Sequence, residues 1–162
     1  MALTYPTIMQ EEIVAKLYKY CAYQDRCTSE VISKLWEWGI PGWQHDEYLA
    51  HLEDERFLDD TRYVRSFVRG KFYHKSWGRE KIRHELRKKQ VPKSLIETGL
   101  AEEIEEETYQ AKVRDLAAKK WRQVEGDLDV KRKEKVVRYL LQKGYLWDEF
   151  RAVLDQLERP KP

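Results

Sequence analysis

Residues 57–92 of the chain read FLDDTRYVRSFVRGKFYHKSWGREKIRHELRKKQVP. In the first half, one face of a predicted helix is formed by Tyr63, Val64, Phe67, Val68, Lys71 and Phe72. Asp59-Asp60 precedes this segment, and aspartate is favoured at a helix N-terminus. Trp77-Gly78 interrupts the apolar pattern, which resumes with Ile82 and Leu86 and stops at Val91-Pro92. The stretch therefore predicts two consecutive amphipathic helices.

The same apolar pattern recurs before and after this stretch. Val31, Ile82 and Val136 are separated by 51 and 54 residues, and so are Leu35, Leu86 and Leu140. Self-similarity at about fifty residues indicates stacked supersecondary units. No alternating run of β-branched residues predicts a strand. We therefore predict an all-α fold of three tandem three-helix repeats, residues 8–56, 57–107 and 108–159, that form an elongated, curved helical array.

Helix ends are less evident from the sequence. Thr28 or Ser29 is a candidate N-cap for the second helix, and Gly144 is a candidate C-cap near the end of the chain. Ser94 with Glu97 has the spacing of a capping box. Between Ser94 and Trp121 only Gly99 could interrupt a helix, so the sequence leaves open whether two helices are separate or fused there.

Composition limits the class of protein. The 162 residues are 41% hydrophobic and 37% charged, with a formal net charge of +2. Cys21 and Cys27 match no metal-binding or redox spacing, so we expect ordinary reduced thiols. The N-terminus lacks the pattern of a secretory signal, and no run of apolar residues is long enough to span a membrane. We expect a cytoplasmic protein.

The motifs of catalytic and metal sites are incomplete. His84-Glu85 begins like a zinc-protease motif, but Lys88 stands where the second histidine is needed. His45 and His51 are six residues apart, which does not place them on one helix face. The acidic run 102–107 is typical of a solvated face. We therefore predict no catalytic residue, no metal site and no cofactor.

The charge of residues 56–92 is the most informative functional pattern. This segment contains twelve Lys and Arg residues but only four acidic residues. The arginines follow helical spacing in two rows, Arg62, Arg65 and Arg69, and then Arg79, Arg83 and Arg87, with Lys88 beside the second row. Arginine suits bidentate contacts with carboxylate or phosphate groups, so the rows predict an anionic partner. The alternative is a solvated surface with helical pairs such as Glu80–His84 and Glu85–Lys89.

The six tryptophans are better explained by core packing than by base stacking, because most lie on apolar faces or at helix ends. Trp77, beside Gly78 in the basic stretch, and Trp38, next to a turn, are the candidates for exposed aromatic residues.

These residues resemble the RecX family, the regulators of the bacterial recombinase RecA. The resemblance rests on Phe57 to Tyr63, Ser66-Phe67-Val68, Trp77-Gly78, Ile82 to Arg87, and Val91-Pro92. Gln90 departs from the glycine that is usual in the family, and Tyr63-Val64 stands where Phe-Ala is common. A weaker resemblance extends over nearly the whole chain, and the family is built of three three-helix repeats.

The resemblance implies a protein without catalytic activity. Family members bind the RecA–single-stranded DNA filament in its helical groove and limit filament growth, ATPase activity and strand exchange. A role in homologous recombination, DNA repair and the SOS response follows, with the chain as a monomer. The arginine rows and Lys88 would contact acidic RecA surface or filament DNA, directly or through the filament.

Two other functions remain open from the residues alone. The chain could be a direct DNA-binding module of helix-turn-helix type, although its basic helix lacks the Asn, Gln and Ser residues that often read base edges. It could also be a helical scaffold whose charged repeats join other proteins.

Overall fold

The computed structural model describes residues 9–159, which form nine α-helices and no strand. The helices are α1 (Glu11–Tyr23), α2 (Thr28–Glu37), α3 (His45–Asp54), α4 (Asp60–Arg69), α5 (Arg79–Lys88), α6 (Lys93–Glu103), α7 (Glu106–Gln123), α8 (Asp129–Lys143) and α9 (Trp147–Glu158). A 3-10 turn, Gly42–Gln44, precedes α3, and a π-helical segment, Gly70–His74, continues α4.

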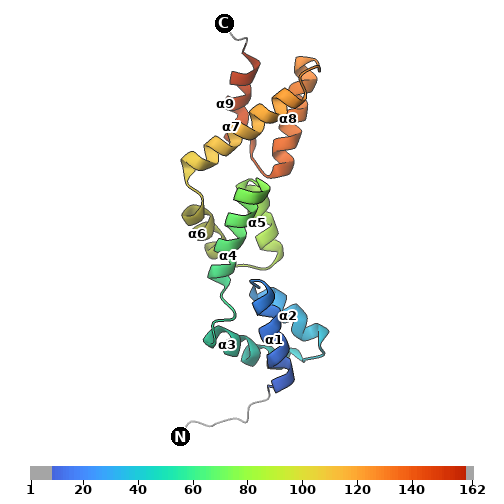
Figure 1. Ribbon diagram of the computed structural model, residues 1–162, viewed down its shortest axis with the longest axis vertical. Helices are drawn as coiled ribbons and strands as arrows, with labels where there is room; N and C mark the ends of the chain where they lie inside the picture. Colours follow the sequence, from blue (N-terminus) through green and yellow to red (C-terminus); the bar gives the residue numbers. More distant parts are fainter. Residues whose placement is uncertain (1–8, 160–162) are drawn as a thin grey trace.

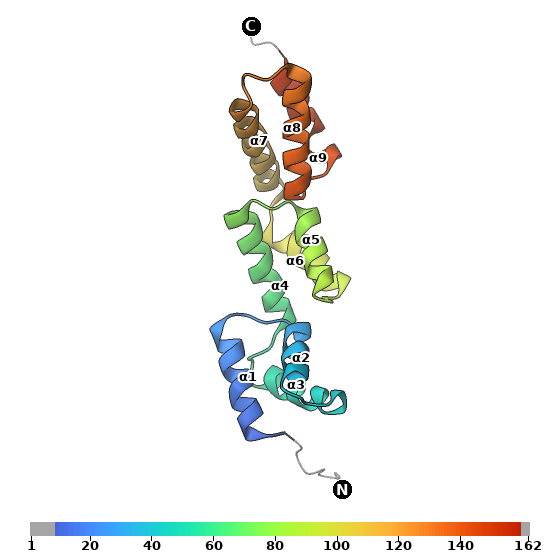
Figure 2. The same cartoon turned by 90° about the vertical axis from the view of Figure 1, so that its right-hand side faces the viewer.

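The helices form three bundles, α1–α3, α4–α6 and α7–α9, that follow one another along an elongated molecule (Figures 1 and 2). The two ends of the chain lie at opposite ends of this array (Figure 1). The predicted fold class, an all-α array of three-helix repeats, is confirmed. The predicted start of the first repeat, residue 8, lies outside the described residues.

Each repeat buries the same positions. The second helices bury the pairs Val31 and Leu35, Ile82 and Leu86, and Val136 and Leu140. The first helices bury three residues at four-residue spacing, which are Ile13, Leu17 and Cys21, then Val64, Val68 and Phe72, then Val113, Ala117 and Trp121. A four-residue spacing keeps side chains on one helix face, so each first helix presents a single apolar stripe to its bundle.

The buried residues fall into two cores. The first repeat has a core of its own, formed by residues between Ile13 and Leu58. The second and third repeats share one continuous core, from Tyr63 to Leu154, to which Cys27 also belongs. Repeats two and three are therefore one folding unit in terms of apolar packing, whereas the first repeat is joined mainly by polar contacts.

The junction of repeats one and two is built around Asp60. Its carboxylate accepts hydrogen bonds from the Thr28 backbone N–H and hydroxyl, each at 2.8 Å. The prediction of Thr28 or Ser29 as the N-cap of α2 is therefore wrong, because α2 begins at Thr28 and Cys27 precedes it as N-cap. Asp59 takes the role expected at the start of α4, where it accepts from the backbone N–H of Arg62 at 3.0 Å.

The junction of repeats two and three brings two backbones into contact. The Gly78 N–H donates to the Lys143 carbonyl at 2.7 Å, and the Glu80 N–H donates to the Gly144 carbonyl at 3.1 Å. Gly144 has φ +98°, the left-handed conformation that favours glycine, which confirms it as the C-cap of α8. Tyr109 of α7 lies beside this contact, fully buried.

The uncertain region after Ser94 contains two separate helices. The break falls at Ile104-Glu105, where both residues are extended. Gly99 does not interrupt α6 but lies buried within it, against Val64. The predicted capping box is also wrong, because Pro92 is the N-cap of α6 and Glu97 accepts a hydrogen bond from Arg83 instead.

Candidate functional site

The six predicted arginines lie on two helices of the middle repeat. Arg62, Arg65 and Arg69 are exposed along α4, whereas Arg79 and Arg83 are partly buried on α5. Arg87 and Lys88 are exposed near the end of α5. The phasing of the two rows agrees with the sequence prediction, but their surroundings do not.

The arginines of α4 are paired with carboxylates. Arg65 Nε lies 2.6 Å from Glu103 Oε1, and Arg69 Nη1 lies 3.0 Å from Glu103 Oε2. Arg62 Nε lies 3.3 Å from Asp25 Oδ1 in the first repeat. The hydrogen bond from Arg65 holds the pKa of Glu103 below its ordinary value, although desolvation acts in the opposite direction. The α4 row therefore contributes to contacts within the chain.

Two arginines of α5 are held more firmly. Arg83 donates to Glu97 at 2.6 Å through Nε and to Glu80 at 2.9 Å through Nη1. Arg79 Nη2 lies 2.7 Å from Glu106, and its guanidinium stacks 3.8 Å from the centre of the Tyr109 ring. These contacts tie α5 to α6 and α7.

The prediction of a solvated acidic run at 102–107 is wrong for Glu103, whose side chain is only 10% exposed and pairs with Arg65. Glu106 is exposed as predicted, although it pairs with Arg79. Acidic residues are scarce near the arginines in the sequence, but the fold brings carboxylates from other segments beside them. The predicted pairs also differ, since Glu80 meets Arg83 and Glu85 meets Lys88 within α5. Lys89 reaches Glu30 of the first repeat at 2.6 Å.

Three lysines without carboxylate partners lie close to Trp77 in the sequence, and two of them lie over its ring. We call Lys71, Lys75 and Lys81 the lysine cluster. Lys71 Nζ lies 4.7 Å and Lys81 Nζ lies 4.5 Å from the centre of the Trp77 ring. No carboxylate within residues 9–159 forms an ion pair with any of the three lysines. Their charge is therefore available to an external anion, with an aromatic ring beside it.

A groove of about 540 Å³ adjoins the cluster along the α4 side of the repeat. Tyr63 and Phe67 line it, and Lys71, Lys75 and His74 lie at the π-helical end. Asp25 and Glu30 of the first repeat also line it, and each is paired with a cation. π-helical segments occur frequently at functional sites. Aromatic side chains and ammonium groups together suit a single-stranded nucleic acid or an acidic peptide, because both ligands offer anionic groups beside flat or apolar ones.

The prediction for the tryptophans requires correction. Trp77 is half-buried and packs against the shared core, and Trp38 is half-buried in the first repeat. The exposed tryptophans are instead Trp36, Trp43 and Trp147. Trp36 directly follows the buried Leu35, so it faces a different side of α2 from the core stripe.

Sequence reasoning named the arginines and missed the lysine cluster. The only available signal was that Lys71, Lys75 and Lys81 surround the Trp77-Gly78 break. The described residues contain no group of three or more histidine, cysteine or carboxylate side chains that could hold a metal ion. None of the helices between residues 9 and 159 is long and apolar enough to cross a membrane.

The arginine–glutamate pairs predict a specific pH dependence. Hydrogen bonds from Arg83 and Arg65 lower the pKa values of Glu97 and Glu103 below the ordinary value of 4.5. The unfolded chain therefore binds protons first as the pH falls, and the free energy of unfolding should decrease progressively as the pH falls below about 5. The stabilisation is fully present only at pH values well above the unfolded-state pKa of 4.5, and it is lost as the pH falls through the lowered pKa values of the folded state.

Urea unfolding followed by circular dichroism at several pH values would measure this dependence. The double variant Glu97→Gln/Glu103→Gln should show a flatter profile than the parent protein. Glu53→Gln/Glu55→Gln, which changes two exposed carboxylates without ion pairs, serves as the matched control and should keep the parent slope. Equal slopes for both double variants would contradict the assigned role of the pairs.

Two family models match most of the second and third repeats. They are described as "RecX, second three-helix domain", over residues 59–100, and "RecX, third three-helix domain", over residues 107–154.

Curated relatives and solved structures agree with these matches. The chain is 31% identical over 152 residues to "Regulatory protein RecX" of Vibrio campbellii, with 92% of each chain covered. It is 30% identical over 138 residues to the protein of that name from Prosthecochloris aestuarii, covering 85% of this chain and 88% of that one. A crystal structure of RecX from Lactobacillus salivarius superposes with a TM-score of 0.78 at 25% identity, over 92% of this chain and 99% of that one. Another crystal structure, of "regulatory protein RecX", also has a TM-score of 0.78, at 26% identity, over 94% and 83% of the two chains.

Proposed function

We propose that this chain, which belongs to the RecX family of regulatory proteins, binds the RecA–single-stranded DNA filament and acts mainly as its inhibitor. In this role it limits filament assembly, ATPase activity and strand exchange without catalytic activity of its own. One observation carries the proposal, namely the similarity to proteins named as regulators across 92% of the chain. Its place of action would be the cytoplasm, in recombination and DNA repair.

The shape of the molecule suits a filament as partner. The three repeats extend in one direction, so different repeats can contact different positions along a long target (Figure 2). Several weak contacts made by one chain act together, since the first contact raises the effective concentration of the others. An elongated array therefore gains affinity for a polymer that it would not have for a single subunit.

Two sets of cations are proposed to contact the filament, and a third set to hold the contact surface in place. The lysine cluster and the exposed Arg87 and Lys88 would meet DNA phosphates or acidic RecA surface directly. The exposed arginines of α4 can exchange Glu103 or Asp25 for a carboxylate of RecA, because surface ion pairs contribute only about 0–1 kcal/mol. Arg79 and Arg83 would hold α5 in position through their ion pairs with Glu106 and Glu97.

The test is the ATPase activity of RecA on single-stranded DNA, measured with and without this protein. We expect the parent protein to lower the rate of ATP hydrolysis. The triple variant Lys71→Glu/Lys75→Glu/Lys81→Glu should require at least about tenfold more protein for the same inhibition, since several favourable charges become repulsive. The variant Arg87→Glu/Lys88→Glu tests the end of α5 separately.

The matched control is Lys19→Glu/Arg122→Glu/Arg159→Glu, which makes the same change in net charge at exposed positions of the first and third repeats. It should inhibit RecA like the parent protein. An absence of inhibition by the parent would refute the proposed function, whereas equal inhibition by the lysine variant and the parent would refute only the proposed contact surface.

Direct DNA binding is distinguished by a separate measurement of the affinity of the protein for single-stranded DNA, with and without RecA and at several salt concentrations. A DNA-binding module would bind single-stranded DNA tightly without RecA, with an affinity that falls steeply as salt is added. A filament regulator should require RecA for tight binding.

A further inference from the structure

Cations of the third repeat continue the lysine cluster across the junction of repeats two and three. Lys143 at the end of α8 donates from Nζ to the Lys75 carbonyl at 3.2 Å. The same ammonium group lies 5.9 Å from the centre of the Tyr139 ring, and Lys120 Nζ of α7 lies 5.1 Å from that centre. We call Lys120, Tyr139 and Lys143 the junction cluster.

The two clusters have the same composition. In each of them two ammonium groups lie over one aromatic ring, which is Trp77 in the lysine cluster. No carboxylate among residues 9–159 forms an ion pair with Lys120 or Lys143. Asp115 of α7 is paired with Lys119 instead, at 3.8 Å. The junction cluster therefore adds two positive charges that the chain itself does not neutralise.

The fold fixes the position of one cluster relative to the other. Repeats two and three share one apolar core, and the Gly78 N–H donates to the Lys143 carbonyl at 2.7 Å. Lys81 of the lysine cluster lies against Gly144, which follows Lys143. A surface that is already arranged in the free protein loses less conformational entropy when a ligand binds to it.

The distribution of charge favours an extension toward the third repeat over one toward the first. Residues 9–56 contain ten Asp and Glu but only five Lys and Arg, whereas residues 108–159 contain nine Asp and Glu and thirteen Lys and Arg. Asp25 and Glu30 of the first repeat also border the groove beside the lysine cluster. A polyanion bound at the lysine cluster is therefore repelled by the first repeat and attracted by the third.

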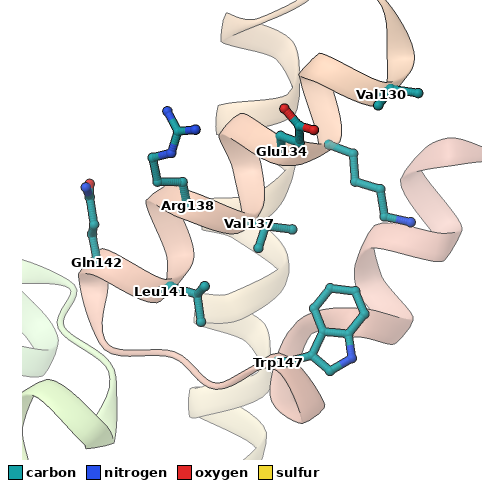
Figure 3. A pocket seen from close by; sticks show the side chains of 8 residues that line it. Val130, Glu134, Val137, Arg138, Leu141, Gln142 and Trp147 are labelled. Carbon is teal, nitrogen blue, oxygen red and sulfur yellow. The ribbon is translucent and has the colours of Figure 1, made fainter.

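The junction cluster lies on a different side of α8 from the apolar surface next to α9. Val137 and Leu141 face Trp147 of α9 (Figure 3). Tyr139 and Lys143 each follow one of these residues by two positions, which is about 200° around a helix. The cationic and aromatic side chains of α8 are thus separated from its apolar side.

We propose that one segment of single-stranded nucleic acid binds across the junction of repeats two and three, from the lysine cluster to the junction cluster. Its phosphates pair with the ammonium groups, and its bases pack on the exposed parts of the Trp77 and Tyr139 rings. The lysines can leave the rings for phosphates, because cation–π contacts near the surface are weak. The inference rests on the proposed function, since it takes the DNA of the filament as the ligand.

The probe is a fluorescein-labelled oligothymidine of about 15 nucleotides, within the range of known single-strand site sizes. Its binding to the full chain without RecA is followed by fluorescence anisotropy at several salt concentrations. We expect weak binding, with a dissociation constant on the order of 10⁻⁵ M at physiological salt. The variant Lys120→Gln/Lys143→Gln should reduce the slope of log affinity against log salt concentration by about 1.4, because each phosphate contact on a single strand contributes about 0.7.

The matched control is Arg122→Gln/Arg159→Gln, which removes the same charge and should keep the parent slope. Arg122 follows Lys120 by two residues and so lies on another side of α7, and Arg159 follows the end of α9. Tyr139→Leu keeps an apolar side chain without an aromatic ring and should bind at least about fivefold more weakly. Tyr23→Leu, at an exposed tyrosine of the first repeat, should leave binding unchanged. Circular dichroism spectra check that every variant is folded.

Three outcomes would overturn the proposal. The first is that the parent protein does not bind the oligothymidine. The second is that Lys120→Gln/Lys143→Gln keeps the parent slope or that Tyr139→Leu keeps the parent affinity. The third is that an oligoglutamate of equal charge displaces the probe as well as unlabelled oligothymidine does, since the surface would then fit an acidic protein. None of these outcomes bears on inhibition of the RecA ATPase, whose absence would refute the proposed function and leave the oligothymidine measurements unchanged.

Discussion

The variant Gly78→Ala is expected to uncouple the third repeat from the second. A methyl group on Gly78 would lie 2.3 Å from the Gly144 carbonyl oxygen and 2.4 Å from its carbon. Both atoms belong to backbone that is held by the hydrogen bond from the Gly78 N–H to Lys143, so no flexible side chain can move aside. Relief of the clash requires the two repeats to separate, with an expected loss of about 3 kcal/mol in the free energy of unfolding.

Urea unfolding followed by circular dichroism would measure this loss. Gly70→Ala is the matched control, because Gly70 has helical backbone angles and nothing lies within 4 Å of an added methyl group. The same substitution should there be neutral or stabilising by up to about 1 kcal/mol. Equal stability of the two variants would contradict the close backbone contact between the repeats.

The repeated helices could be predicted from the sequence because each repeat buries apolar residues at equivalent positions of its helices. A short helix must present one apolar stripe to its bundle, and the stripe leaves its spacing in the sequence, as Ile82 and Leu86 do. No comparable sequence pattern indicates the end of α6 after Glu103. Gly99 offered the only visible signal there, and it serves instead to let α6 approach Val64 of α4.

The candidate site could be predicted only in part, since the pairing of a surface charge depends on tertiary structure. An added methyl group on Gly99 would lie 2.5 Å from Val64, so the glycine permits the close packing of α6 on α4. This packing brings Glu103 to Arg65. Charges 38 residues apart in sequence carry no sign of such a contact. The sequence therefore identifies the arginines, but it does not show that the lysine cluster lacks carboxylate partners within the described residues.

Tyr109 offers the second large expected effect, because its side chain fills the junction of repeats two and three. The ring lies fully buried between Phe72, 5.8 Å away by ring centres, and Tyr145, at 5.4 Å. The Arg79 guanidinium covers the ring, and the Tyr109 hydroxyl accepts a hydrogen bond from the Arg79 N–H at 3.2 Å. Tyr109→Ala should lower the free energy of unfolding by about 3–5 kcal/mol, as expected for removing a large buried aromatic residue.

The variant Tyr109→Phe separates packing from polar contact. It keeps the ring between Phe72 and Tyr145 and removes only the hydroxyl, which accepts from the Arg79 N–H and also interacts with the Glu149 side chain. The expected loss is about 1–2 kcal/mol. Urea unfolding should show a broad or two-step transition for Tyr109→Ala, because repeats that no longer share a core unfold separately. A single sharp transition with a loss no larger than that of Tyr109→Phe would show that the shared core does not depend on this ring.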